Sequence, residues 1–211
     1  MLQKFQNHID NNLPCLKESK LLLAISGGVD SVVLAYLCKS TGLDVSFAHC
    51  NFKLRGEESD NDERFVDALG LKLNIEVFIQ SFDTKNYAKE HKLSIQVAAR
   101  ALRYQWFKEL REQLHFDYIL TAHHADDNLE TFLINLSRGT GIEGLTGIPE
   151  VNDTIVRPLL PFTRQELINY AKEACINWRE DASNAETKYL RNKLRHEVIP
   201  VLKGINPQLI Q

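Results

Sequence analysis

The sequence predicts an α/β fold, a doubly wound and mostly parallel sheet with helices on both faces, followed by a short C-terminal helical extension. Its 211 residues suit one domain with a short extension. Short apolar runs alternate with helical patterns, as they do in βαβ units. Polar clusters follow these runs, at the carboxyl ends of the expected strands, where parallel sheets bind ligands.

Apolar runs of strand length define the expected sheet, and they lie at residues 21–26, 44–50, 74–80 and 117–122. Residues 155–156 form one more short candidate strand before Arg157-Pro158. With helical patterns between them, these runs predict parallel strands joined by helices.

Helical patterns cover residues 29–40, 94–114, 126–138 and 163–175. The 29–40 segment is apolar almost all round, which is typical of a helix packed inside an α/β layer. Thr163 and Glu166 have the spacing of a capping box, so the last of these helices is expected to start there. The basic stretch 189–202 is the expected helical extension.

Charge is distributed unevenly along a chain whose net charge is −3. Residues 1–156 carry 16 basic and 22 acidic side chains, whereas residues 157–211 carry 9 and 6. A basic C-terminal end is compatible with nucleic-acid contact, and equally with a solvated helical surface. We expect residues 1–205 to form one domain and residues 206–211 to be the start of a truncated C-terminal region.

Several classes of protein lose support on composition. No apolar run reaches the ~18 residues that cross a bilayer, and the N-terminus has no signal-peptide core, so we expect a cytoplasmic chain without membrane contact. Cysteines at 15, 38, 50 and 175 form no C-x-x-C pair, which argues against a zinc ribbon, an iron–sulfur ligand pair and a thioredoxin-type dithiol. Gly139–Gly144 fits G-x-G-x-x-G but follows a helix, so a dinucleotide site is not indicated.

The segment Ser-Gly-Gly-Val-Asp-Ser at 26–31 lies between a strand and a helix. Two glycines allow a tight turn whose N–H groups face an anion, and the helix N-terminus adds partial positive charge. Ser26 and Ser31 can donate hydroxyls, and Asp30 is expected to hold Mg²⁺ that accompanies a pyrophosphate. No Walker pattern occurs. The alternative is an ordinary capped strand–helix turn.

A second polar cluster, His123-His124-Ala125-Asp126-Asp127, lies between strand 117–122 and helix 126–138. Asp127 and Glu130 are three residues apart and so can face one cleft. Helix capping is the alternative for the aspartates, Asp126 above all. A zinc-type site is a further alternative.

These motifs carry a family resemblance. Residues 26–31 resemble the pyrophosphate loop of the N-type ATP pyrophosphatases, and the later motifs resemble, in order, the tRNA(Ile)-lysidine synthetases within that group. The later motifs are AHCNFKLR (48–55), ARALRY (99–104), TAHHADDNLET (121–131), RGTGIEGLTGI (138–148) and RNKLR (191–195). Phe52 stands where that family usually has His. The acidic stretch 56–60 after Lys53 and Arg55 is expected to be a lid over the nucleotide or a charged loop.

The resemblance implies an adenine-nucleotide alpha-hydrolase-like fold that uses ATP and Mg²⁺. It implies that the wobble cytidine of tRNA(Ile) with a CAU anticodon is adenylated and that free L-lysine then displaces AMP, giving lysidine, AMP and pyrophosphate. The alternatives are another adenylating enzyme of the group, a tRNA thiolase or an amidotransferase, and a non-catalytic ATP-binding module. The sequence leaves open whether the chain forms a homodimer.

The resemblance also implies roles for single residues. The residues expected to bind ATP are Ser26, Gly27, Gly28, Val29, Asp30, Ser31, Arg191 and Arg195. The expected catalytic residues are Asp30, Arg103, His123 and Asp127, with Asp30 and Asp127 as Mg²⁺ ligands. A solvated helix face is the alternative for each arginine, and a structural role is the alternative for His123.

Overall fold

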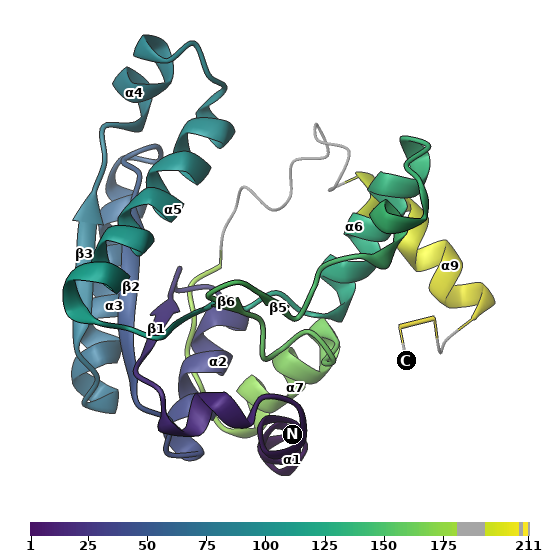
Figure 1. Cartoon of the computed structure of the whole chain (residues 1–211), viewed down its shortest axis with the longest axis horizontal. Coiled ribbons are helices and arrows are strands. Elements are labelled where there is room, and N and C mark those ends of the chain that lie inside the picture. Colours follow the sequence, from purple (N-terminus) through teal and green to yellow (C-terminus); the bar gives the residue numbers. More distant parts are fainter. Residues whose placement is uncertain (181–192, 207–208, 211) are drawn as a thin grey trace.

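A computed structural model describes residues 1–180, 193–206 and 209–210 of the chain (Figure 1). Its centre is a six-stranded sheet in the order β3-β2-β1-β4-β6-β5, in which only β5 runs antiparallel to its neighbour. The strands are β1 (Leu21–Ala24), β2 (Val45–Asn51), β3 (Val77–Ser81), β4 (Tyr118–Leu120), β5 (Val151–Asn152) and β6 (Ile155–Val156). The predicted α/β class is confirmed, and each expected strand is present.

Helices connect the strands. They are α1 (Leu2–Asn12), η1 (Pro14–Glu18), α2 (Val29–Ser40), α3 (Glu57–Leu73), α4 (Thr84–Glu90), α5 (Ile95–Leu114), α6 (Ala125–Ser137), η2 (Ile142–Thr146), α7 (Arg164–Glu173), η4 (Leu194–Val198) and α9 (Ile199–Ile205). The bounds expected for α2 agree with the structure, and those of α5, α6 and α7 agree within two residues. Thr163 and Glu166 form the predicted capping box of α7, with Glu166 N donating to Thr163 Oγ1 at 3.2 Å. None of the described helices is both long enough and apolar enough to cross a bilayer.

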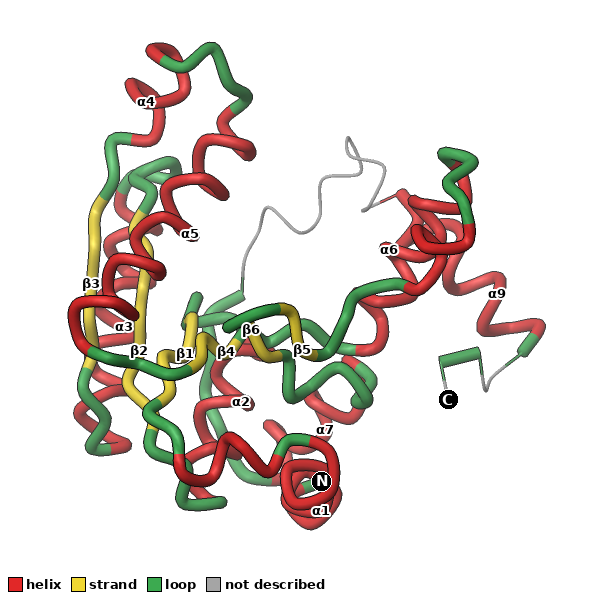
Figure 2. The backbone as a smooth tube through the Cα atoms, in the orientation of Figure 1, coloured by secondary structure: helices red, strands yellow, loops and turns green. Residues whose placement is uncertain are grey.

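Residues of β1 alternate between two apolar layers, and this alternation builds the double winding. Leu21 and Leu23 face a large core formed with α1, α2, α3 and α7. Leu22 faces the opposite way, into a smaller core with Phe107 and Leu110 of α5. Both faces of the central strand are therefore covered by helices, as a buried parallel sheet requires (Figure 2).

The chain changes direction across the sheet between β1 and β4. From β1 it moves outward to β2 and β3, and it then returns through α4 and α5 to β4 on the other side of β1. In Figure 1, α4 and the start of α5 rise beyond the end of β3, while α6 and α9 extend away on the opposite side. The carboxyl ends of β1 and β4 lie between these two extensions, and this is the position where such sheets bind ligands.

Three local expectations need correction. Residues 57–60 are neither a lid nor a loop but the first turn of α3, whose Val66 and Leu69 pack into the large core. Within the expected loop 138–149, residues 142–146 form a short 3₁₀ helix. The C-terminal extension is helical where described, but its first part, η4, is a π turn, and residues 189–192 lie outside the described residues.

Candidate functional site

The turn after β1 presents its backbone toward the carboxyl edge of the sheet. Gly27 has φ +91°, a conformation that side chains other than hydrogen disfavour, and Gly28 is the N-cap of α2 without a side-chain cap. Ser31 Oγ donates to Gly28 O at 3.0 Å and lies 3.1 Å from Ser26 Oγ. The serines therefore fix the turn, and the Ser31 hydroxyl, which was expected to donate to an anion, donates within the turn instead. The first N–H groups of α2 have no side-chain cap, so the anion site at this turn stays a prediction.

Arg179 ties this turn to two other elements. Its backbone N–H donates to Gly27 O at 2.9 Å. Its guanidinium pairs with Asp62 of α3 at 2.9 Å and with Glu58 at 2.6 Å. The segment after α7 and the first turns of α3 thus support the turn from outside.

The two residues that follow the glycines point in different directions. The Val29 side chain is buried in the large core, so only its backbone can contact a ligand. Asp30 faces the site, and its Oδ1 is buried without a hydrogen-bond partner. Burial raises the pKa of Asp30, and Asp127 adds to the rise, although His124, Arg164 and Arg195 oppose it. A positive ligand would relieve this desolvated carboxylate.

His124 lies at the centre of the second cluster. It is 2% exposed and is the N-cap of α6. Its ring Nδ1 accepts a hydrogen bond from the backbone N–H of Asp127 at 3.3 Å. The backbone N–H of His124 donates to Asp127 Oδ2 at 3.1 Å, and the two bonds together make a capping box. Its Nε2 lies 3.4 Å from Asp127 Oδ2 and 3.7 Å from Asp30 Oδ2. His124 therefore stands between the carboxylates that follow β1 and β4.

Asp127 and Glu130 share one face of α6, as their spacing predicted, and Arg195 of η4 contacts both. Arg195 Nε donates to Glu130 Oε1 at 2.5 Å, and its Nη2 lies 3.4 Å from Asp127 Oδ1. Glu130 is fully buried. Burial lowers the pKa of Arg195, but Glu130, Asp127 and Asp30 outweigh burial and raise it, so the guanidinium stays charged.

Asp126 points away from this cluster. It accepts a hydrogen bond from Arg164 N at 2.7 Å and pairs with Lys203 Nζ of α9 at 2.6 Å. Burial opposes its charge, yet these two contacts prevail and lower the pKa of Asp126. Asp126 thus joins α6 to the start of α7 and to α9, in line with the structural alternative.

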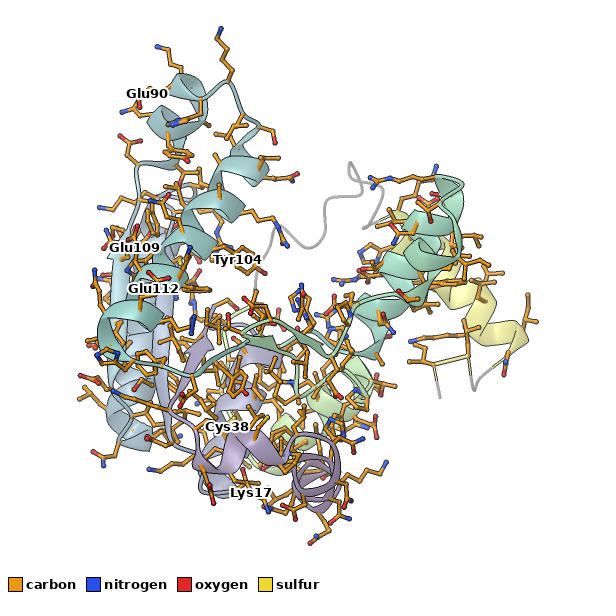
Figure 3. All side chains as sticks on the ribbon, viewed as in Figure 1. Lys17, Cys38, Glu90, Tyr104, Glu109 and Glu112 are labelled. Carbon is orange, nitrogen blue, oxygen red and sulfur yellow. The ribbon has the colours of Figure 1, made fainter. Side chains whose placement is uncertain are left out.

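In the part of the chain that the structure describes, the remaining predicted residues contact side chains other than those of Asp30, His124 and Asp127. Thr121 Oγ1 is 3.0 Å from Nδ1 of His123, on the segment that leads from β4 to α6. Arg103 on α5 stands 5.2 Å from the ring of Phe52, beyond the end of β2. On the same helix, Tyr104 faces the side of α6 in Figure 3 and carries Arg100 over its ring. Arg191 falls outside the described residues.

Sequence reasoning favoured His123 over His124, whereas the structure puts His124 between the carboxylates. The pattern His-x-x-Asp before an apolar helix was the available signal, because an imidazole nitrogen can cap a helix as a serine oxygen does. Sequence reasoning also missed that Glu130 is buried and paired with a residue 65 positions away. No local pattern encodes that contact.

The site fits Mg²⁺ better than a transition metal. No group of three or more histidine, cysteine or acidic side chains that could hold a metal occurs among the described residues. Mg²⁺ usually needs only one or two carboxylates, because substrate phosphates and water supply the other ligands. Asp30, with its unpartnered buried oxygen, and Asp127 suit that role.

Comparison with known proteins places the chain in a family. A family model described as a PP-loop domain matches residues 1–202. The chain belongs to this PP-loop family.

Curated relatives give the comparison more detail. A tRNA(Ile)-lysidine synthase of Porphyromonas gingivalis W83 is 50% identical over 190 residues, which cover 90% of this chain and 42% of the relative. One of Bacteroides thetaiotaomicron is 45% identical over 207 residues, 98% of this chain and 49% of the relative. The chain therefore spans about half the length of these relatives.

Among solved structures, the U34-tRNA thiolase NcsA from Methanococcus maripaludis matches with a TM-score of 0.78 at 16% identity, over 98% of this chain and 74% of that one. At this identity the likeness concerns the fold alone. It agrees with the doubly wound sheet.

Proposed function

We propose that the chain, over residues 1–205, is the catalytic part of an enzyme that ligates lysine to C2 of the wobble cytidine in tRNA(Ile) with a CAU anticodon. One observation carries the proposal. Asp30 after β1 and Asp127 after β4 converge on His124, beside a glycine turn with free helix N–H groups. Membership of the PP-loop family and the names of the relatives support the same activity.

In this proposal the turn 26–31 binds the pyrophosphate of ATP. The N–H groups at the start of α2 and the Ser26 hydroxyl donate to phosphate oxygens. Asp30 and Asp127 hold Mg²⁺, which supplies positive charge against the phosphates when it is bound. Arg103, Arg191 and Arg195 add cations toward the ATP or RNA phosphates, and His123 contacts the phosphates from the β4 side.

The chemistry has two steps. The C2 oxygen of cytidine attacks the α-phosphorus of ATP while the bond to the β-phosphate oxygen breaks, and pyrophosphate leaves. The ε-ammonium of lysine then loses a proton to water, the free amine attacks C2, the C–O bond to AMP breaks, and the newly bonded nitrogen loses a second proton. Asp127 attracts the lysine ammonium electrostatically and so helps to place the nucleophile.

The experiment measures AMP release from ATP and Mg²⁺ with tRNA(Ile) bearing CAU, with and without lysine, followed by mass analysis of the wobble nucleoside. We expect a lysine-dependent mass gain at that cytidine. A matched tRNA with another wobble base and a reaction with EDTA are the controls.

The same experiment identifies the alternatives. AMP release with an unmodified wobble cytidine would contradict lysine ligation and indicate another adenylating enzyme of the PP-loop family. ATP binding with no AMP under any of these conditions would indicate a binding module. If only a longer version of the protein shows the mass gain, catalysis by residues 1–205 alone is contradicted.

A further inference from the structure

We infer that His124 is a positioning residue, which sets the spacing between the carboxylates of Asp30 and Asp127 and thereby prepares the site for a divalent cation and ATP. The inference rests on the proposed function, because it concerns the same site. It assigns His124 two separable tasks, one for each ring nitrogen.

The first task is helix capping, and it fixes the orientation of the ring. Nδ1 accepts a hydrogen bond from Asp127 N at 3.3 Å. An imidazole nitrogen that accepts carries no proton, so in the neutral ring the proton is on Nε2. The hydrogen bond to Nδ1 holds the ring in this orientation, and the residue is 2% exposed.

The second task belongs to the Nε2 proton. Nε2 lies 3.4 Å from Asp127 Oδ2 and 3.7 Å from Asp30 Oδ2. These carboxylates come from α6 and α2, on opposite sides of the point where the sheet changes direction. Two carboxylates that face one site repel each other, and a fixed N–H dipole between them reduces that repulsion.

Other charges around the ring act on only one of the two carboxylates at close range, although Arg195 also attracts Asp30 from further away. Asp126 Oδ2 is 3.8 Å from Nδ1, but that carboxylate is held by Arg164 N and Lys203. Arg195 reaches Asp127 through the other carboxylate oxygen, Oδ1, and binds Glu130. Among the described basic side chains, His124 is therefore the one with a ring nitrogen within 4 Å of both Asp30 and Asp127.

Two variants separate the tasks. The amide of His124→Asn reaches about as far as Nδ1, and Asn is a favoured N-cap residue, so capping survives while the Nε2 proton is lost. The amide of His124→Gln reaches the position of Nε2 but is a poor cap. His115→Asn is the matched control, because His115 is exposed at the opposite edge of the sheet and its φ of +56° suits Asn.

The test measures thermal unfolding, Mn²⁺ binding by paramagnetic resonance with a non-hydrolysable ATP analogue, and AMP release. For His124→Asn we expect a nearly unchanged melting temperature, about 10- to 100-fold weaker Mn²⁺ binding and a similar fall in kcat for AMP release. For His124→Gln we expect a lower melting temperature with Mn²⁺ binding close to that of the original protein. His115→Asn should change none of these quantities.

Two results would overturn the inference. One is Mn²⁺ binding that is unaltered in His124→Asn, which would make His124 a helix cap only. The other is loss of stability and of Mn²⁺ binding together in both variants, which would make it a packing residue. Because Mn²⁺ binding needs no tRNA and no lysine, it reports on His124 even if lysine ligation itself is not found.

Discussion

Asp126 and Asp127 are adjacent and chemically identical, yet they act in different places. Asp127 contacts His124 and Arg195 in the candidate site, whereas Asp126 binds Arg164 N and Lys203. The difference arises from the helical rotation of about 100° between successive residues at the start of α6. At the residue scale, position on the helix, rather than side-chain type, decides whether an aspartate faces the candidate site or the contact with α7 and α9.

Asp30→Asn tests the Mg²⁺-binding role that the proposal gives to Asp30. We expect AMP release to fall by about 100-fold or more, because an amide cannot replace a carboxylate toward Mg²⁺. The thermal stability of the variant, in contrast, should rise at pH 7. Burial raises the pKa of Asp30, so its contribution to stability is present below the ordinary pKa of 3.8 and is lost as pH rises through the raised value.

The neutral amide of Asp30→Asn suffers no such loss, so the variant should melt higher than the original protein at pH 7 without metal. The gap should close below about pH 4. Thermal unfolding at these two pH values measures it. A variant that melts lower at pH 7 would show that the carboxylate is stabilised in the folded protein.

Arg195→Ala tests the ion pair on α6. Its removal takes the guanidinium from the buried Glu130, so we expect a loss of about 2 kcal/mol in the free energy of unfolding and a higher KM for ATP. Glu130→Gln in the same background should restore part of the stability but not the KM. Chemical denaturation and ATP titration measure the two effects, and an unchanged KM would place Arg195 outside the nucleotide site.

At the element scale, two helical glycines differ in how closely their surroundings are packed. Gly70 lies in α3, where a Cβ would run into the Val77 side chain and come within 3.0 Å of Ile75 O. Gly204 lies in α9 with open space around it. The same substitution should therefore have opposite effects at these positions.

We expect Gly70→Ala to destabilise the protein by about 1–3 kcal/mol through overpacking between α3 and β3. Gly204→Ala should stabilise it by up to about 1 kcal/mol, because alanine favours helix. Urea denaturation measures both. A neutral Gly70→Ala would mean that α3 can move away from β3 at little expense in energy.

Sequence periodicity predicted the elements that alternate cleanly between strand and helix, including the exact span of α2. It failed for α1, in which Phe5 and Ile9 are its buried residues and provide too short an apolar pattern. It also missed α3 (Glu57–Leu73), whose acidic first turn concealed the helix. The stripe of Val66 and Leu69 further along α3 was the available signal.

The candidate site was predictable only where local sequence patterns determine it. Local chemistry and the carboxyl-end rule placed Asp30 and Asp127 at one edge of the sheet. The contact between Arg195 and Glu130 depends on how η4 packs against α6, and a contact between residues so distant in sequence leaves no local pattern. Roles carried by tertiary packing therefore had to come from the structure.

Thiol accessibility reports on the whole molecule. Cys15 and Cys175 are exposed, Cys38 is buried, and burial raises the pKa of Cys50 to about 12. We expect Cys15 and Cys175 to react quickly with a disulfide reagent at pH 8, the partly exposed Cys50 to react slowly because its raised pKa leaves little thiolate, and Cys38 to react only on unfolding. A third fast thiol would show that the layer between β2 and α5 opens in solution.

The strand order has a consequence for synthesis on the ribosome. β1 is among the first segments made, yet it lies in the middle of the sheet, and its second neighbour, β4, follows about 100 residues later. Translation adds about 5–20 residues per second, so β1 waits roughly 5–20 s for that partner. During this interval the edge of β1 that pairs with β4 in the folded protein has no partner strand, so its backbone N–H and C=O groups are open to other strands.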